Sequence, residues 1–104
     1  MHSVAEALEH PKREELELPR ILHALSDPVR LQIVCSIANG GECAMGAIEV
    51  PVTKSTCTHH FKVLRDAGVL AQRQVGTARL NTLRREDLDA RFPGLLDTVL
   101  RSAE

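Results

Sequence analysis

Aromatic side chains are nearly missing from this sequence, which has no Trp, no Tyr and only Phe61 and Phe92. Its hydrophobic fraction of 43% is nevertheless normal for a globular protein, so the core is expected to be aliphatic, as in packed helices. No apolar run approaches the ~18 residues that span a bilayer, and the acidic start of the chain has no apolar block followed by a cleavage site. These absences predict neither membrane insertion nor secretion, and they place the protein in the cytoplasm.

Cysteine is also scarce, and the three that occur are irregularly spaced. An odd number without a repeated spacing does not form the disulfide framework of a small secreted domain. The sequence further lacks paired carboxylates, a nucleophile–base spacing and a Gly loop that could cradle phosphates, so an enzyme is not expected. With 104 residues the chain has room for one domain with one core.

The net charge of −1 is unevenly distributed along the chain. Residues 54–85 hold seven basic side chains and one acidic side chain, Asp66, for a charge of +6, whereas the rest of the chain carries −7. A concentrated basic segment in a neutral chain is typical of a phosphate-binding face. A solvated basic surface without a partner would have the same pattern, so charge alone leaves both interpretations open. The basic residues are Lys54, Lys62, Arg65, Arg73, Arg79, Arg84 and Arg85.

The first part of the chain divides into an arm and the start of a helical domain. Residues 1–17 contain five Glu and little apolar patterning, so we expect a flexible acidic arm before a folded domain over 18–104. Apolar spacing predicts a helix over 18–25. Asp27 and Pro28 then signal a new helix, because the carboxylate can accept amide protons and Pro at the first position loses no hydrogen bond.

The second half changes from helical to strand periodicity and back. After a segment with a turn or two of helix, Thr53 caps an expected helix over 54–67, which a glycine ends. Two short strands, 71–75 and 79–83, follow around a turn that contains Gly. A last helical region, interrupted by Pro93, completes the chain. This order predicts a mostly α fold with a small β-hairpin, in the arrangement of a winged helix-turn-helix.

The expected 54–67 helix has two opposite faces. Cys57, Phe61 and Leu64 gather on the side that should pack on the core, while hydroxyl, imidazole and ammonium groups gather on the other. That polar set suits base edges and phosphates in a major groove. An ordinary amphipathic surface helix is the alternative; the following hairpin favours DNA binding, because each of its strands carries an Arg near the turn. The predicted DNA-binding residues are Lys54, Ser55, Thr56, Thr58, His59, Lys62, Arg65, Arg73 and Arg79.

Two stretches of the chain resemble the ArsR/SmtB family of bacterial repressors. Residues 24–34, ALSDPVRLQIV, are similar to the family's opening signature, and residues 54–70, KSTCTHHFKVLRDAGVL, are similar to its recognition helix. The similarity covers most of the chain in the right order. It implies a homodimer whose recognition helices read a palindrome in double-stranded DNA, and release of that DNA when a ligand binds or cysteines are modified. By position, Ser55, Thr58 and His59 match the family's base-reading residues.

The sequence departs from the family where many members bind metal. In place of a Cys-x-Cys pair it has Cys43, Ala44 and Met45, and its last helix has no His. We therefore expect no metal and no cofactor. Cys35 matches the first of two sensing cysteines in sulfide- and redox-responsive members, although the last helix has no second one. Cys35 and Cys43 are candidate redox sensors, and the alternative is that the cysteines only pack.

The first and last helices are expected to form a two-fold dimer interface, because an apolar stripe on a terminal helix is unfavourable in water. The sequence therefore predicts a dimeric transcriptional repressor whose effector and operator are unidentified. A winged-helix protein-interaction module without DNA binding is the alternative, but such a module would more often expose apolar anchors than this polar helix face. The predicted interface residues are Ile21, Leu22, Leu25, Phe92, Leu95, Leu96, Val99 and Leu100.

Overall fold

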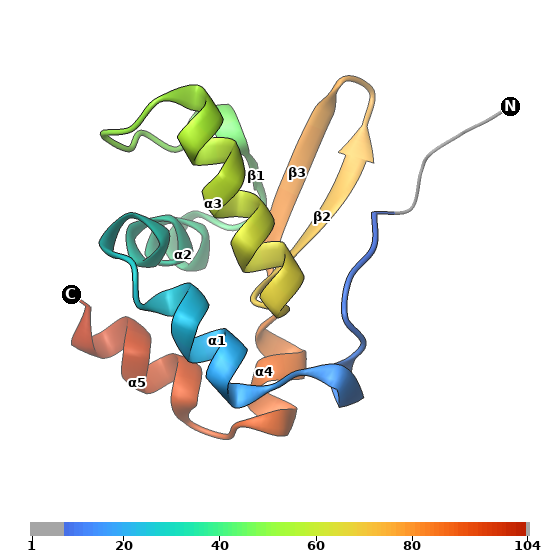
Figure 1. Ribbon diagram of the computed structural model, residues 1–104, viewed down its shortest axis with the longest axis vertical. Helices are drawn as coiled ribbons and strands as arrows, with labels where there is room; N and C mark the ends of the chain where they lie inside the picture. The colour runs from blue at the N-terminus through green and yellow to red at the C-terminus, as the bar shows by residue number, and fades with distance from the viewer. Residues whose placement is uncertain (1–7, 104) are drawn as a thin grey trace, which may run out of the picture.

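Helices form most of the protein, and a small sheet projects from them (Figure 1). The computed structural model describes residues 8–103. Figure 1 shows α3 and the β2–β3 hairpin at one end of the molecule and α1, α4 and α5 at the other. None of the described helices is long and apolar enough to cross a membrane. In chain order the elements are η1 (Arg13–Glu15), α1 (Leu18–Leu25), α2 (Pro28–Gly40), β1 (Cys43–Ala44), η2 (Met45–Ala47), α3 (Lys54–Ala67), β2 (Leu70–Val75), β3 (Ala78–Leu83), α4 (Arg85–Arg91) and α5 (Leu95–Ser102).

Local capping explains where α2 begins and where α3 begins and ends. The Asp27 carboxylate accepts the first amide protons of α2 at 2.9 and 3.0 Å, and Thr53 Oγ1 accepts the Thr56 amide proton of α3 at 3.3 Å. Helix α3 ends at Gly68, whose φ of 91° lies in the left-handed region that glycine adopts without strain. A Cβ at Gly68 would also collide with the side chain of Leu16. These predicted boundaries are confirmed.

The sheet has three antiparallel strands in the order β1-β3-β2, one more than the predicted hairpin. Strand β1 pairs Cys43 with Asn81 and Ala44 with Leu80. The expected short helix is reduced to the 3-10 turn η2, and the predicted interruption at Pro93 separates α4 from α5. We call the β2–β3 hairpin the wing; it is joined by the turn between Val75 and Ala78.

The core is aliphatic, as the scarcity of aromatic residues predicts. It contains side chains from α1, α2, α3, α4, α5 and the start of β2, with Phe61 as its aromatic member. Fully buried positions on both sides of the α3–β2 junction fix the wing's base to the helical body. They are Leu64, Val69 and Leu70, and they belong to the same core cluster as Ile33 and Val34 of α2.

The described part of the N-terminal segment lies against the folded body, which differs from the expected flexible arm over 1–17. Leu16 is 2% exposed, and the carbonyl oxygens of Pro11 and Arg13 accept hydrogen bonds of 2.7 Å from two arginines near and in α4. The physical reason is that Leu16 fills the space above Gly68, a contact between positions far apart in sequence. Residues 1–7 of the predicted arm lie outside the described residues.

Candidate nucleic-acid interface

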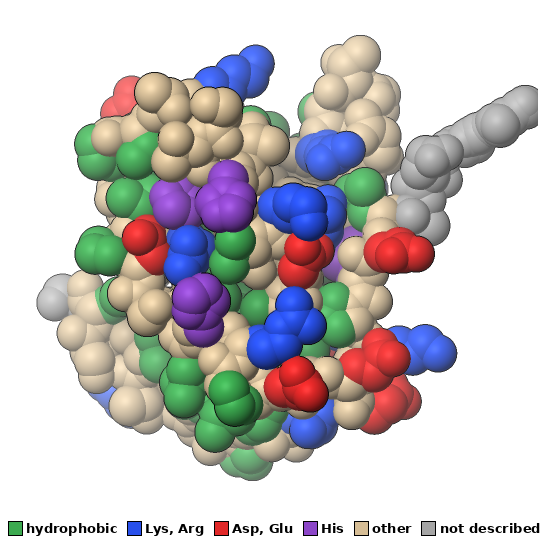
Figure 2. Space-filling view, viewed as in Figure 1, with side chains coloured by type: hydrophobic (Ala, Val, Ile, Leu, Met, Phe, Trp, Pro, Cys, Tyr) green, Lys and Arg blue, Asp and Glu red, His purple; other side chains and the backbone are tan. Residues whose placement is uncertain are grey.

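Helix α3 is amphipathic in the predicted sense. Cys57, Phe61 and Leu64 are buried, and so is His60, for which no role was predicted. Figure 2 shows His side chains and Lys or Arg side chains gathered on the face over α3, with acidic side chains among them. The opposite, exposed positions of α3 are Lys54, Ser55, Thr56, Thr58, His59 and Lys62.

The hydroxyl groups on this face are held by hydrogen bonds within the helix. Thr58 Oγ1 donates to the Lys54 carbonyl oxygen at 3.0 Å, and Thr53 Oγ1 donates to Thr56 Oγ1 at 2.9 Å. A hydroxyl that donates its proton in this way keeps lone pairs that can accept from an amino group of a base. The face therefore offers oriented acceptors beside the His59 imidazole and the Lys54 ammonium.

Arg73, on the wing, is already paired with a carboxylate. Its Nε and Nη2 donate to the two carboxylate oxygens of Glu42 at 2.8 and 2.9 Å. The hydrogen bond from Arg73 lowers the pKa of Glu42 against the opposing effect of burial, so the pair is ionised at neutral pH. This bidentate geometry limits how far Arg73 can reach a DNA phosphate.

Lys62 and Arg65 share the carboxylate of Asp66. Lys62 Nζ lies 2.8 Å from Asp66 Oδ2, and Arg65 Nε lies 3.5 Å from Asp66 Oδ1. Arg65 Nη1 also donates to Gln72 Oε1 at 3.0 Å, and the Arg65 side chain is only 15% exposed. Arg65 therefore ties α3 to the wing, which its expected role as a surface phosphate contact did not include.

Lys54 and Arg79 differ from these three. Both are exposed, and neither forms an ion pair within residues 8–103. Arg79 Nε donates to the neutral Gln74 Oε1 at 3.4 Å, and Gln74 Nε2 donates to the Gly76 carbonyl oxygen at 3.0 Å. The wing tip thus supports a cation whose charge is not compensated.

A hollow of about 340 Å³ lies between α3 and the wing. Its lining includes apolar side chains, and its polar lining comes from both elements, with three cationic side chains among them. A concave surface with this charge suits the sugar–phosphate backbone of a nucleic acid. The lining residues are Leu8, Met45, Thr58, Phe61, Lys62, Arg65, Gln72 and Arg79.

Arg30 connects three helices through a buried guanidinium, which reasoning from the sequence missed. It is 8% exposed, and its Nε and Nη2 donate to the carbonyl oxygens of Ala24 and His23 at 2.8 and 3.3 Å, at the end of α1. Its Nη1 lies 3.2 Å from His60 Nδ1 on α3, so this nitrogen acts as the acceptor. Asp27, the cap of α2, lies 3.9 Å from His60 Nε2.

The predicted interface residues divide into buried and accessible sets. Ile21, Leu25 and Leu96 are between 1% and 7% exposed inside the single chain, so they cannot line a surface as the sequence analysis expected. Their spacing is helical, but it points into the chain's own core. Leu22, in contrast, is 47% exposed, and Leu18, one turn away on α1, is 40% exposed. The half-buried members on α4–α5 are Phe92, Leu95, Val99 and Leu100.

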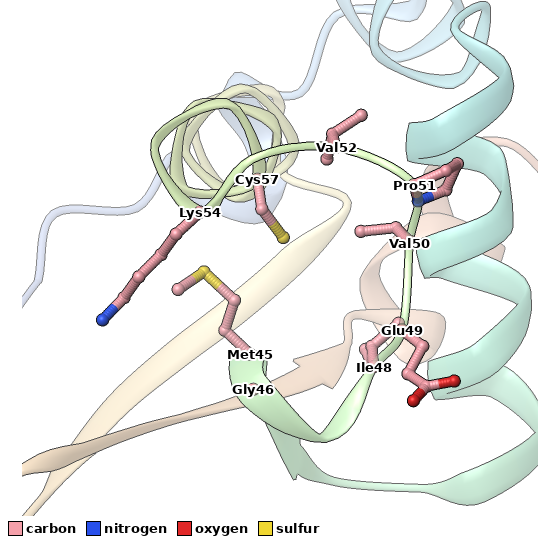
Figure 3. A pocket seen from close by; sticks show the side chains of 9 residues that line it. All are labelled: Met45, Gly46, Ile48, Glu49, Val50, Pro51, Val52, Lys54 and Cys57. Atoms are coloured by element: carbon pink, nitrogen blue, oxygen red, sulfur yellow. The ribbon is translucent and has the colours of Figure 1, made fainter.

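The cysteines occupy three separate environments. Cys35 lines a hollow of about 320 Å³ between α2 and α5, opposite Leu100 and Ala103. Burial raises the pKa of Cys43 and of Cys57, which keeps these thiols protonated at neutral pH. Another hollow, of about 640 Å³, lies between the segment 45–52 and the start of α3, and Figure 3 shows the Cys57 side chain directed into it from α3. Among residues 8–103 no cluster of three or more His, Cys, Asp or Glu could hold a metal ion.

Comparison with known proteins shows the same architecture in bacterial regulators. The family model for bacterial regulatory proteins of the arsR family matches residues 27–71. The uncharacterized HTH-type transcriptional regulator YceK of Bacillus subtilis is 34% identical over 77% of this chain and 83% of its own length. The arsenical resistance operon repressor of Staphylococcus xylosus is 36% identical over 70% of this chain and 71% of its own. The crystal structure of the transcriptional repressor BigR from Xylella fastidiosa superposes with a TM-score of 0.59, at 26% identity, over 72% of this chain and 85% of that one.

Proposed function

This chain belongs to the arsR family of bacterial regulatory proteins, and on that premise we propose that it is a sequence-specific repressor that binds a palindromic operator as a homodimer. Its relatives are named as transcriptional regulators and not as enzymes. The observation that carries the proposal is the exposed polar face of α3 beside a wing with an uncompensated cation.

In the proposed complex α3 enters the major groove. Ser55, Thr58 and His59 contact base edges, because their side chains are exposed on one face and carry donors and acceptors. Lys54 and Arg79 neutralise phosphates, because they form no ion pair within the described part of the chain. Arg73 and Lys62 contribute less, since each must first leave a carboxylate.

The proposed dimer brings two such faces to one DNA duplex. Its support is the apolar surface that α1 and α5 leave partly uncovered, with Leu18 and Leu22 on the first helix and Leu95 and Val99 on the last. A two-fold arrangement would place the half-sites about one helical turn, or a multiple of it, apart.

The test separates base contacts from general charge. A duplex is selected from a random pool by the wild-type protein, and its affinity is compared with that of a scrambled duplex for Thr58→Ala and His59→Ala. Each substitution should remove about 1–3 kcal/mol of discrimination while leaving affinity for the scrambled duplex nearly unchanged. Thr98→Ala, at an exposed position of α5, is the matched control.

Two outcomes would contradict the proposal in different ways. Unchanged discrimination in Thr58→Ala and His59→Ala would mean that α3 is not the reading element. A folded protein that selects no duplex at all would favour the alternative, a winged-helix module that binds another protein through this face.

A further inference from the structure

Strand β2 is an edge strand whose exposed side is occupied by the N-terminal segment. The sheet order β1-β3-β2 leaves one side of β2 without a partner strand. At the middle of this side the backbone N–H of Gln72 donates to Nε2 of His10 at 2.9 Å. The imidazole therefore takes the place of a carbonyl oxygen that a neighbouring strand would supply.

The side chain of the same residue, Gln72, makes further hydrogen bonds inside the protein. Its Oε1 accepts from Arg65 Nη1 on α3 at 3.0 Å, and its Nε2 donates to Asn81 Oδ1 on β3 at 2.7 Å. Asn81, which is fully buried, donates from Nδ2 to the Cys43 carbonyl oxygen on β1 at 3.2 Å. These hydrogen bonds join the N-terminal segment, α3 and all three strands, and in a polar network of this kind the loss of one bond affects its neighbours.

His10 can accept from Gln72 only while its Nε2 carries no proton. The charged groups that act on it are Arg65 and Asp66 on α3 and Arg84 after β3. His10 also lines a surface hollow together with Glu9 and with Arg20 of α1. Burial lowers the pKa of His10 below its ordinary 6.5, and Arg84 and Arg65 lower it further against the opposing effects of the Leu8 backbone and Asp66. The unprotonated state is therefore the one present at neutral pH.

We propose that His10 is a positioning residue for DNA binding, which fixes the wing against α3 when unprotonated and releases it when protonated. This inference rests on the proposed function, because α3 and the wing are the two elements assigned to DNA. Protonation would set an N–H of the imidazole against the N–H of Gln72 and would add a cation beside Arg65 and Arg84. Arg79 on the wing would then lose its fixed position relative to Thr58 and His59.

The sign of the pH effect follows from the direction of the shift. The pKa of His10 is lowered in the folded protein, so the contribution of the network is fully present above the ordinary value of 6.5 and is lost as the pH falls through the folded pKa. Loss of one buried hydrogen bond corresponds to about a three- to ten-fold change in an equilibrium constant. We expect the affinity for DNA to fall by that factor on acidification.

The experiment compares wild type with His10→Gln and His10→Phe on the selected duplex between about pH 7.5 and about pH 5. Gln offers an amide oxygen that can accept from Gln72 and does not titrate, so this variant should keep its affinity and show a flatter pH profile. Phe offers no acceptor, so its affinity at neutral pH should match that of acidified wild type. The other four histidines of the sequence are present in all three proteins, so the comparison isolates the effect of His10. Superimposable pH profiles for wild type and His10→Gln would overturn the proposal.

A measurement without DNA separates this inference from the proposed function. The backbone N–H of Arg73 points at β3, because hydrogen-bonding groups alternate along the strand, so it serves as the reference. The ratio of the amide exchange rate of Gln72 to that of Arg73 should rise on acidification, and it should be raised in His10→Phe. Equal protection of Gln72 in all states would show that His10 holds nothing, whether or not the protein binds DNA. If the Gln72 amide exchanges as predicted but the protein binds no DNA, the role of His10 in holding β2 stands and the proposed function is wrong.

Discussion

The Arg73–Glu42 pair gives the wing a cation that is neutralised before DNA arrives. Both oxygens of the carboxylate are used, and the two residues are 31 positions apart in the chain. Any phosphate that binds Arg73 must displace Glu42, whose carboxylate keeps its charge well below neutral pH because Arg73 lowers its pKa. At the scale of single residues, Glu42 therefore weakens non-specific attraction to DNA.

We predict that Glu42→Gln increases the affinity for scrambled DNA more than the affinity for the selected duplex. An amide cannot neutralise Arg73, so up to one more phosphate contact becomes available, and the slope of log affinity against log salt should steepen by up to about one unit. Titrations at several salt concentrations measure that slope. Glu86→Gln makes the same change in net charge at a carboxylate that is 94% exposed on α4. If both variants have the same slope, the effect is one of net charge and the pair is unimportant.

At the scale of elements, Cys35 lies where α2 meets α5. It lines the hollow of about 320 Å³ with Leu100 and Ala103, so atoms added to its sulfur would be placed between the two helices. Overfilling a packed site typically costs about 1–3 kcal/mol, which is comparable to ordinary allosteric coupling energies. A change in the angle between α2 and α5 would reach α3 through the core residues that α2 shares with it.

We predict that polysulfide treatment lowers DNA affinity of the wild type by about five-fold or more, and that Cys35→Ser abolishes this response. The measurement is affinity for the selected duplex before and after treatment. Cys43→Ser tests whether Cys43 is a resolving thiol; because burial raises the pKa of Cys43, we expect this variant to respond like wild type. Equal affinities before and after treatment in all proteins would leave the cysteines as packing residues.

The helices could be predicted from the sequence because their signals are local. Asp27, Thr53 and Gly68 each act on residues within four positions, and the buried side of α3 follows from helical spacing. Strand β1 could not, because two residues without apolar alternation become a strand only by pairing with β3. Asn81 reads as an exposed strand residue and is fully buried.

The candidate site shows the same limit. The exposed residues of α3 follow from helical spacing, and so does the pairing of Lys62 with Asp66 four positions away. The partners that Arg65 and Arg73 find on other elements do not follow from local spacing. Arg65 bonds across to β2, and Arg73 bonds back to the segment before β1. Arg30 is the clearest case, because its acceptors belong to two other helices.

At the scale of the whole molecule, assembly determines how many reading faces meet one duplex. Leu18 and Leu22 are one turn apart on α1 and are the large exposed apolar side chains of the helical body, while Val75 is on the wing. An isolated chain would leave this surface in water, so the proposed dimer is expected to cover it.

We predict that Leu22→Glu shifts the protein from dimer to monomer, because an unpaired carboxylate in an apolar interface costs several kcal/mol. Sedimentation at micromolar concentration measures the assembly, and affinity for a duplex with two half-sites should fall with it. Val75→Glu, at a side chain that is 45% exposed on the wing, is the matched control and should remain dimeric. A Leu22→Glu protein with an unchanged sedimentation coefficient would exclude this face as the interface.

The buried guanidinium of Arg30 has a consequence for the spacing of half-sites that the proposed dimer can bind. It bonds the end of α1 to His60 of α3, so the helix proposed for dimerisation and the helix proposed for reading turn as one piece. In the proposed dimer the distance between the two α3 helices would then be fixed by the angle at which the α1 helices cross. Operators whose half-sites are one base pair too close or too far would be rejected without any change in the bases contacted.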